Sequence, residues 1–179
     1  MMVDFYNFVY GILRQEQRLV LMVVIANEGS SPGRKGFKMV VSRQDMYGTI
    51  GGGIMEHKLV EYAQSLLDKP SFSPFIKHQI HDKSAVKDQS GMICSGKQTI
   101  AFYDIKDDFL PTVDTIITKE DVSVSYSNFG IATTVEKSTA FEWYFEEKNA
   151  LTQKVYIIGG GHVGLALSEV LSHLDFEIH

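Results

Sequence analysis

The sequence has few of the features that mark secreted or membrane proteins. Its 179 residues include a single cysteine, Cys94, so no disulfide can form within the chain, which fits a reducing compartment. The longest apolar run, Leu19 to Ala26, is far too short to span a bilayer, and residues 1–6 lack the basic start of a signal peptide. We therefore expect a cytoplasmic protein that does not enter a membrane.

The chain also lacks any concentration of positive charge. It has 17 Lys and Arg against 22 Asp and Glu, a net charge of −5, and no basic run. Binding a phosphate backbone needs clustered cations, so this balance argues against a general nucleic-acid binder. No group of His, Cys, Asp and Glu has the spacing of a metal site. An apolar content of 44% is ordinary for a globular protein of one or two domains.

Periodicity predicts strands and amphipathic helices joined by glycine-rich loops. The apolar run at 19–26 is typical of a central strand buried on both faces. A turn is expected at 45–48, a polar linker at 146–153 and a domain boundary near residue 150. The predicted helices cover 4–16, 54–69, 113–117 and 163–174. The predicted strands cover 19–26, 37–42, a short stretch ending at 50, 75–81, 98–103, 122–126, 131–135, 140–145, 154–158 and a start at 176. These elements predict an α/β fold, with a mixed-sheet α/β domain over 1–150 followed by a partial Rossmann-like βαβ unit over 151–179.

The first glycine-rich loop, residues 27–36, follows the predicted central strand. Ser30, Ser31 and Arg34 can offer hydrogen bonds and positive charge to an anion, although a solvated connection explains the same composition. The next loop follows a neighbouring strand, so we expect the two loops to open at the same end of a sheet, where ligands bind in open α/β folds.

That next loop has three consecutive glycines, Gly51, Gly52 and Gly53, directly before a helix. The first amides of a helix have no internal partners, and together with the helix dipole they suit a phosphate or carboxylate. The alternative is a tight turn without a ligand. Glu56 lies in the first helical turn, where it either interacts with the dipole or lines the mouth of a ligand pocket.

Cys94 lies between Gly91 and Gly96, at the entrance to a predicted strand. A thiolate in such a position can bind a soft metal or carry sulfur. A buried free cysteine that acts as a small apolar residue is the alternative.

The last glycine loop, 159–164, has the order strand, G-x-G-x-x-G, helix that a Rossmann fingerprint requires, with Gly159, Gly161 and Gly164 at the three motif positions and His162 between them. This motif predicts binding of NAD(P) or another nucleotide. The acidic residue that grips a ribose is absent, and a unit of this size cannot bury its own core. Either the chain is a fragment or a partner completes the unit, and we expect a homodimer or larger assembly in which the partner covers the apolar stripe of the helix.

Four ordered motifs, Gly-Ser-Ser-Pro at 29–32, Thr-Ile-Gly-Gly-Gly-Ile-Met-Glu at 49–56, Gly-Met-Ile-Cys-Ser-Gly at 91–96 and Gly-Gly-Gly-His-Val-Gly at 159–164, resemble the XdhC/CoxI family of xanthine dehydrogenase accessory proteins. The resemblance covers nearly the whole chain. Here Ser95 stands where the family more often has glycine, and the family's C-terminal Rossmann domain is longer.

This resemblance implies a chaperone that binds the molybdenum cofactor, as molybdopterin or its dinucleotide form, and assists its sulfuration and insertion into a molybdenum hydroxylase client. A cysteine desulfurase is an implied partner, and Cys94 would meet the cofactor metal. No catalytic residue is identified. The alternatives are an NAD(P)-dependent oxidoreductase, which would need an acid–base pair that the motif lacks, and a nucleotide-sensing regulatory module.

Overall fold

One long strand organises the structure. The computed structural model describes residues 2–15, 18–80, 96–119, 122–134, 139–149, 153–172 and 176–179. Its largest sheet has the order β3-β2-β1-β5-β4, with β1 (Leu19–Gly29) in the centre and buried from Leu19 to Ile25, as predicted. The other strands of this sheet are β2 (Lys38–Val41), β3 (Met46–Gly48), β4 (Phe75–Ile80) and β5 (Gly96–Ile105).

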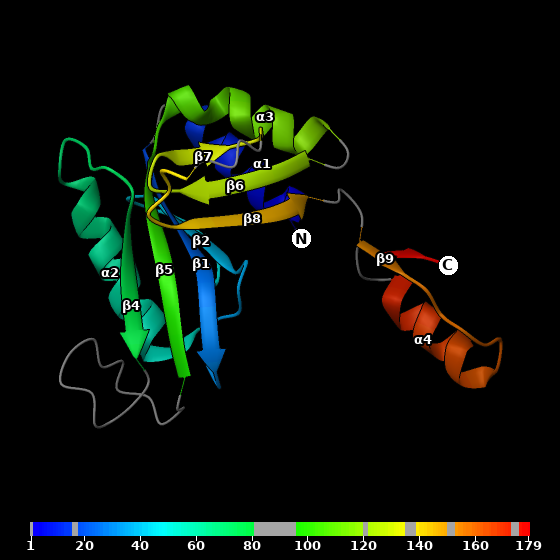
Figure 1. Ribbon diagram of the computed structural model, residues 1–179. Coiled ribbons are helices and arrows are strands. Elements are labelled where there is room, and N and C mark those ends of the chain that lie inside the picture. Colours follow the sequence, from blue (N-terminus) through cyan, green and yellow to red (C-terminus); the bar gives the residue numbers. More distant parts are fainter. Residues whose placement is uncertain are drawn as a thin grey trace.

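Both faces of this sheet are covered (Figure 1). Side chains alternate along a strand, so Leu21 and Val23 of β1 enter one core while Met22 and Val24 enter the other. α2 (Gly53–Leu67) packs on the second core. The elements that close the first core are α1 (Met2–Leu13), a 3-10 turn η1 (Asp107–Phe109), α3 (Leu110–Thr118) and a second sheet of order β7-β6-β8, formed by β6 (Val122–Ser127), β7 (Gly130–Ala132) and β8 (Tyr144–Asn149).

The remaining elements form a small βαβ unit. β9 (Gln153–Val155) pairs in parallel with β10 (Phe176–Ile178), and α4 (His162–Ser172) connects them. Every other strand pair in the described residues is antiparallel. Figure 1 shows the unit set apart from the two sheets. Helices packed on sheets confirm the predicted α/β class.

β7 and β9 end earlier than the strands predicted at 131–135 and 154–158, and two other stretches differ more from the sequence prediction. The expected turn at 45–48 is wrong, because 46–48 pair with 39–41 as an edge strand and the turn lies at 42–45, where the Ser42 amide donates to the Asp45 carbonyl at 2.8 Å. The strand expected at 140–145 begins later, at Tyr144, and runs through polar residues that were assigned to a linker. These polar side chains tolerate a strand because they find partners on neighbouring elements, as described below.

No helix in the described part of the chain is both long enough and apolar enough to span a bilayer. The predicted boundary near residue 150 falls at residues 150–152, outside the described part of the chain, and stays a prediction.

Candidate functional site

Three chain segments meet at one end of the main sheet. β1 and β3 run in the same direction, because β2 lies between them and pairs antiparallel with both. The loops that follow β1 and β3 therefore leave the sheet at the same end. β5 runs antiparallel to β1, with Gly96 opposite Gly29, so β5 begins where β1 ends. We call the meeting point of these segments the glycine cradle, and it comprises Ser31, Gly33, Gly51, Gly96 and Gln98.

The glycines of the cradle are needed for close approach. A Cβ on Gly51 would lie 2.6 Å from the Gly33 amide nitrogen, and the φ of Gly51 is +131°, which side chains rarely adopt. A Cβ on Gly33 would collide with the Ile50 carbonyl oxygen, and one on Gly96 with the Ser31 backbone. Backbone thus packs directly on backbone, as expected for loops brought to the same sheet end.

Gln98 is the buried side chain that joins these segments. Its Oε1 accepts hydrogen bonds from the Ser31 hydroxyl at 2.8 Å and from the Gly33 amide at 3.1 Å. Its Nε2 donates to the Ile50 carbonyl at 3.3 Å and to Oε1 of Gln79 on β4 at 2.9 Å. The side chain of Gln98 is therefore saturated, and both glycine loops depend on it.

Sequence reasoning missed Gln98, although a signal for it was present. Side chains on β5 alternate between the two faces, and Gln98 has the same parity as Ile100 and Phe102, which lie in the second core. A polar amide on that face is buried and must find partners. The partners themselves come from distant segments and are visible only in the fold.

The triglycine loop has a different electrostatic state from the one predicted. Oε2 of Glu56 accepts hydrogen bonds from the Thr49 hydroxyl at 2.6 Å, the Ile50 amide at 2.8 Å and the Gly52 amide at 2.9 Å. Partial burial acts to raise the pKa of Glu56, but these hydrogen bonds outweigh it and leave the pKa below its ordinary value of 4.5. The carboxylate of Glu56 therefore already occupies donors that were expected to face a ligand.

The amides that remain for a ligand lie further along α2. The first amides of a helix lack intrahelical acceptors, and Gly53 and Ile54 follow Gly52 at the exposed start of α2. Ser30 and Arg34 are exposed on the adjacent loop. Cys94 lies outside the described residues, so only Gly96 of its motif is placed.

The loop after β1 is anchored at its far end as well. Nζ of Lys38 donates to the Gly36 carbonyl at 2.9 Å and pairs with Glu147 of β8 at 2.7 Å, and both side chains are largely buried. Glu147 also accepts from the Tyr126 hydroxyl at 2.7 Å, which in turn lies 2.6 Å from the hydroxyl of Tyr6. Burial raises the pKa of both tyrosines, so they stay protonated. The second sheet thus holds the base of the first glycine loop.

A small cavity opens beside the cradle. It has a volume of about 300 Å³ and is lined by ends of β1, β4 and β5. Glu28 and Lys97 give its wall charges of both signs, and His78 Nδ1 lies 3.0 Å from the Thr99 hydroxyl. Its volume is at the lower end of the range of small-ligand sites.

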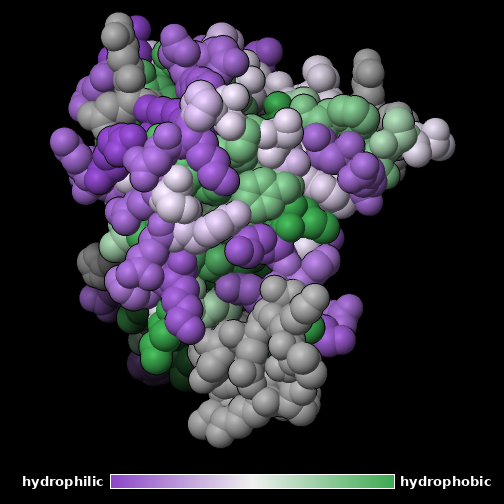
Figure 2. Space-filling model, turned by 90° about the vertical axis from the view of Figure 1, so that its left-hand side faces the viewer, coloured by the Kyte–Doolittle hydropathy of each residue, from purple (hydrophilic) through white to green (hydrophobic). Residues whose placement is uncertain are grey.

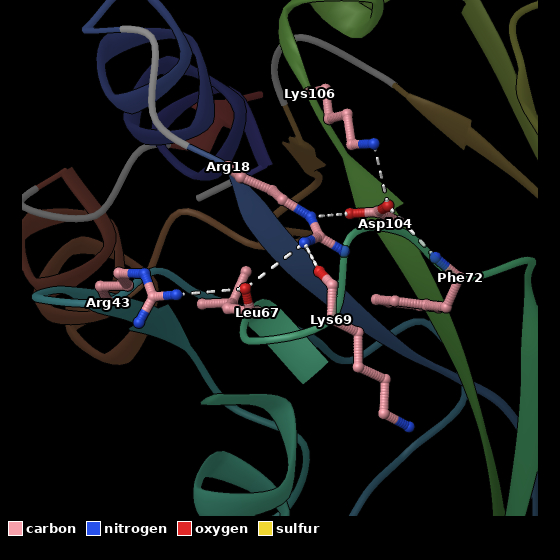
Figure 3. Close-up of polar contacts among 7 residues, drawn as sticks. All are labelled: Arg18, Arg43, Leu67, Lys69, Phe72, Asp104 and Lys106. Atoms are coloured by element: carbon pink, nitrogen blue, oxygen red, sulfur yellow. Dashed lines mark hydrogen bonds and ion pairs between the residues drawn. The ribbon is translucent and has the colours of Figure 1, made fainter. Parts of the chain in front are cut away.

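The opposite end of α2 is fixed by two arginines (Figure 3). Arg18 forms an ion pair with Asp104 at 2.5 Å and donates to the carbonyls of Leu67 and Lys69, while Arg43 donates to the Leu67 carbonyl at 3.2 Å. Cations at a helix C-terminus donate hydrogen bonds to its free carbonyls and interact favourably with the negative end of the helix dipole. Because its C-terminus is held in this way, α2 presents its N-terminus at a fixed position in the cradle.

The last glycine loop has a Rossmann-like local geometry. Gly159 has a φ of +121°, and a Cβ on Gly164 would collide with the Gly159 carbonyl, which gives the third glycine of the motif its close-packing role. Gly161 and His162 are exposed. The structure does not bring this loop to the cradle, since Figure 1 shows α4 on the separate unit. The predicted apolar stripe of α4 is open, with Val163 83% and Val170 62% exposed.

Residues 12–73 match the model of the XdhC and CoxI family. The matched segment contains β1, β2, β3 and α2, and therefore Ser31, Gly33, Gly51 and Glu56, whereas Gln98 lies beyond it. The resemblance predicted from the glycine motifs is thereby confirmed over this segment.

The other comparisons concern whole chains. Comparison with curated proteins gives no match. A crystal structure from Bacillus halodurans, described as a xanthine dehydrogenase, matches 98% of this chain with a TM-score of 0.65 at 17% identity. This chain spans 60% of the length of that protein. At this identity the likeness shows a shared fold, which extends beyond the segment matched by the family.

Proposed function

We propose that this chain is an accessory protein that binds the molybdenum cofactor and assists its sulfuration and insertion into a molybdenum hydroxylase of the xanthine dehydrogenase type. It would act as a binding and delivery protein rather than as a turnover enzyme. The observation that carries the proposal is that the XdhC and CoxI match covers the very loops that meet in the glycine cradle. The xanthine dehydrogenase description of the structural neighbour supports the proposed client class.

The residues at the cradle suit part of such a ligand. When bound, the cofactor brings a phosphate or pyrophosphate and a metal held by soft sulfur ligands. The Gly53 and Ile54 amides, the Ser30 hydroxyl and the Arg34 guanidinium are donors for the phosphate. The ionised Glu56 repels an anion from the Ile50 and Gly52 amides, so the phosphate would be held on the outer side of the loop.

Cys94 is the residue that we propose for the sulfur chemistry of this site. It precedes Gly96 of the cradle by two positions, and a thiolate binds soft metals. In this proposal a cysteine desulfurase supplies the sulfur, and Cys94 stays close to the bound cofactor. Replacing Cys94 by serine should reduce delivery of active cofactor to a client apoenzyme while the melting temperature stays unchanged. A lowered melting temperature with normal delivery would make Cys94 a packing residue.

A second candidate function is nucleotide binding at residues 159–164. The specific observation is the parallel β9–α4–β10 unit, in which Gly164 packs on Gly159 and the first turn of α4 has no acidic residue. The backbone amides at the start of α4 are therefore open to a phosphate, unlike the Ile50 and Gly52 amides, which donate to Glu56. We further propose that a second copy of the chain covers the exposed stripe of α4, which would complete the unit as a homodimer.

Identification of the small molecules that the purified protein carries tests the proposal. The protein is denatured, and the released compounds are identified by mass spectrometry. A released pterin supports the cofactor chaperone, release of only NAD(P) or AMP supports the second candidate, and release of none of these compounds contradicts both. Arg34→Gln should lower pterin retention about tenfold, the effect of losing one charge-assisted hydrogen bond, whereas Arg14→Gln, at an exposed position just after α1, should not.

A further inference from the structure

Gln98 is almost wholly buried, with 1% of its surface exposed, yet it lies at the end of the sheet where the glycine loops leave. Its four partners come from three separate segments: Ser31 and Gly33 from the loop after β1, Ile50 from the loop after β3, and Gln79 from β4. Sulfur of Met55 on α2 lies 3.8 Å from Nε2 as well. No other side chain described here contacts both glycine loops through hydrogen bonds.

The chemistry of the partners fixes the orientation of the amide. The Gly33 amide can only donate, so it must face Oε1, and the Ile50 carbonyl can only accept, so it must face Nε2. An amide is therefore required, because a carboxylate lacks the donor and an apolar side chain lacks both groups. The two loops also lie in direct backbone contact at Gly33 and Gly51, so a small movement of either loop changes the other.

We infer that Gln98 is a positioning residue for the glycine cradle, whose amide sets the separation of the two loops and thereby the affinity for the ligand. This inference rests on the proposed function only for the identity of that ligand. The role is distinct from packing, since an isosteric side chain of the wrong hydrogen-bonding pattern fills the same space.

Amide hydrogen exchange of the ligand-free protein tests the positioning role directly. Gln98→Glu should raise exchange about tenfold or more in peptides covering 29–36 and 49–56, while peptides from α1 and α3 keep the wild-type rate. Lys97→Gln, on the exposed neighbouring position of β5, is the matched control and should leave every peptide unchanged. Unchanged exchange in both loops, or an equal rise across all peptides, would overturn the inference.

The pH dependence of amide exchange in the two loops distinguishes the hydrogen bonds of the residue at position 98 from the space that its side chain fills. A protonated carboxyl at position 98 regains a donor, so the loosening by Gln98→Glu, relative to wild type at the same pH, should be smaller at pH 5 than at pH 8. Gln98→Met, which has no such group, should loosen the loops equally at both pH values. Equal pH behaviour of the two variants would contradict the assigned role of the amide.

Two further outcomes keep the inference independent of folding and of the proposed function. If Gln98→Glu fails to fold, Ser31→Ala removes one partner and should raise exchange more in 29–36 than in 49–56, while peptides from α1 and α3 stay unchanged; a uniform response across all peptides would overturn the inference. If the wild type retains pterin, Gln98→Met, assayed well below its melting temperature, should retain at least fivefold less, and full retention would count against the role in affinity. Absence of pterin from the wild type contradicts the proposed function alone, because the exchange results stand without a ligand.

Discussion

The two glycine loops that precede α2 and α4 share a sequence pattern but differ in their physical state. In the first, Gly51 packs on Gly33 and the adjacent amides donate to Glu56. In the second, a Cβ added to Gly160 or Gly161 would have no neighbouring atom within 4 Å, and the first turn of α4 has no acidic residue. A run of glycine before a helix therefore has two uses, close packing in one case and an open backbone in the other.

The surroundings of the two loops differ in the same way. The core beneath α2 is apolar and contains packed aromatic side chains, with Phe75 and Phe102 stacked at 4.9 Å and Tyr62 edge-on to Phe102. Figure 2 shows the side of the molecule that includes α2 and β4, where hydrophobic residues gather between hydrophilic ones. α4 has no buried residue in the described unit. The first loop is thus fixed by its context, whereas the second is free to meet a ligand or a partner.

The largest expected effect comes from removing the anchor of the loop that follows β1, on which Gly51 packs. Glu147→Ala leaves the Lys38 ammonium buried without its partner and removes an acceptor from Tyr126. Breaking a buried pair in this way should lower the free energy of unfolding by about 4 kcal/mol. Chemical denaturation measures the loss, and a loss below about 1 kcal/mol would show that the loop does not depend on this anchor. The double variant Lys38→Met with Glu147→Leu should recover most of the stability, since no charge remains buried.

Gly51→Ala tests the close packing itself. The added Cβ meets the Gly33 amide, and the backbone at φ +131° is strained for alanine, so the free energy of unfolding should fall by about 3 kcal/mol. The matched control is Gly160→Ala in the open loop, which should lose less than about 1 kcal/mol. Equal losses in the two loops would remove the distinction between them.

Glu56→Gln tests whether the first loop is closed by its own carboxylate. Loss of the charge weakens three hydrogen bonds and should cost about 1 kcal/mol at pH 7. The pKa of Glu56 is lower in the folded protein than in the unfolded chain, so its contribution is present above the unfolded pKa and is lost as the pH falls through the folded value, below 4.5.

The stability difference between wild type and Glu56→Gln should therefore shrink toward pH 3. Denaturation curves at pH 7 and pH 3 measure this change. Glu61→Gln, on an exposed part of the same helix, is the control and should change little at either pH. A difference that is constant with pH would argue against the assigned state of Glu56.

The smallest effect is expected for Gly161→Ala. Open space surrounds this position, so the free energy of unfolding should change by less than about 0.5 kcal/mol. Binding of NAD(P) or AMP, measured by calorimetry, should weaken if the loop holds a phosphate, because the Cβ blocks the approach to the backbone. A large loss of stability would place Gly161 in the same class as Gly51.

Much of the fold followed from local pattern. The buried run at 19–26 predicted the central strand, the spacing of apolar residues predicted α1 and α2, and the strand–glycine–helix order at 154–174 predicted the β9–α4–β10 unit. The short strand expected to end at residue 50 lies earlier, as β3 at 46–48, and the limits of β8 also differ, since short edge strands and polar strands are stabilised by pairing and by side-chain partners rather than by their own hydrophobicity.

The sequence alone determined which residues form glycine loops and on which face of its strand each side chain lies, because those properties depend on neighbours in the chain. Only the tertiary structure decided that Gly33, Gly51 and Gly96 meet, that Gln98 joins them, and that Glu56 takes the amides of the triglycine loop. Partners such as Ser31 and Gln98 lie 67 positions apart, and nothing in either local pattern encodes the other. The order and direction of the strands bring them together, and these were fixed by burial of two cores at once.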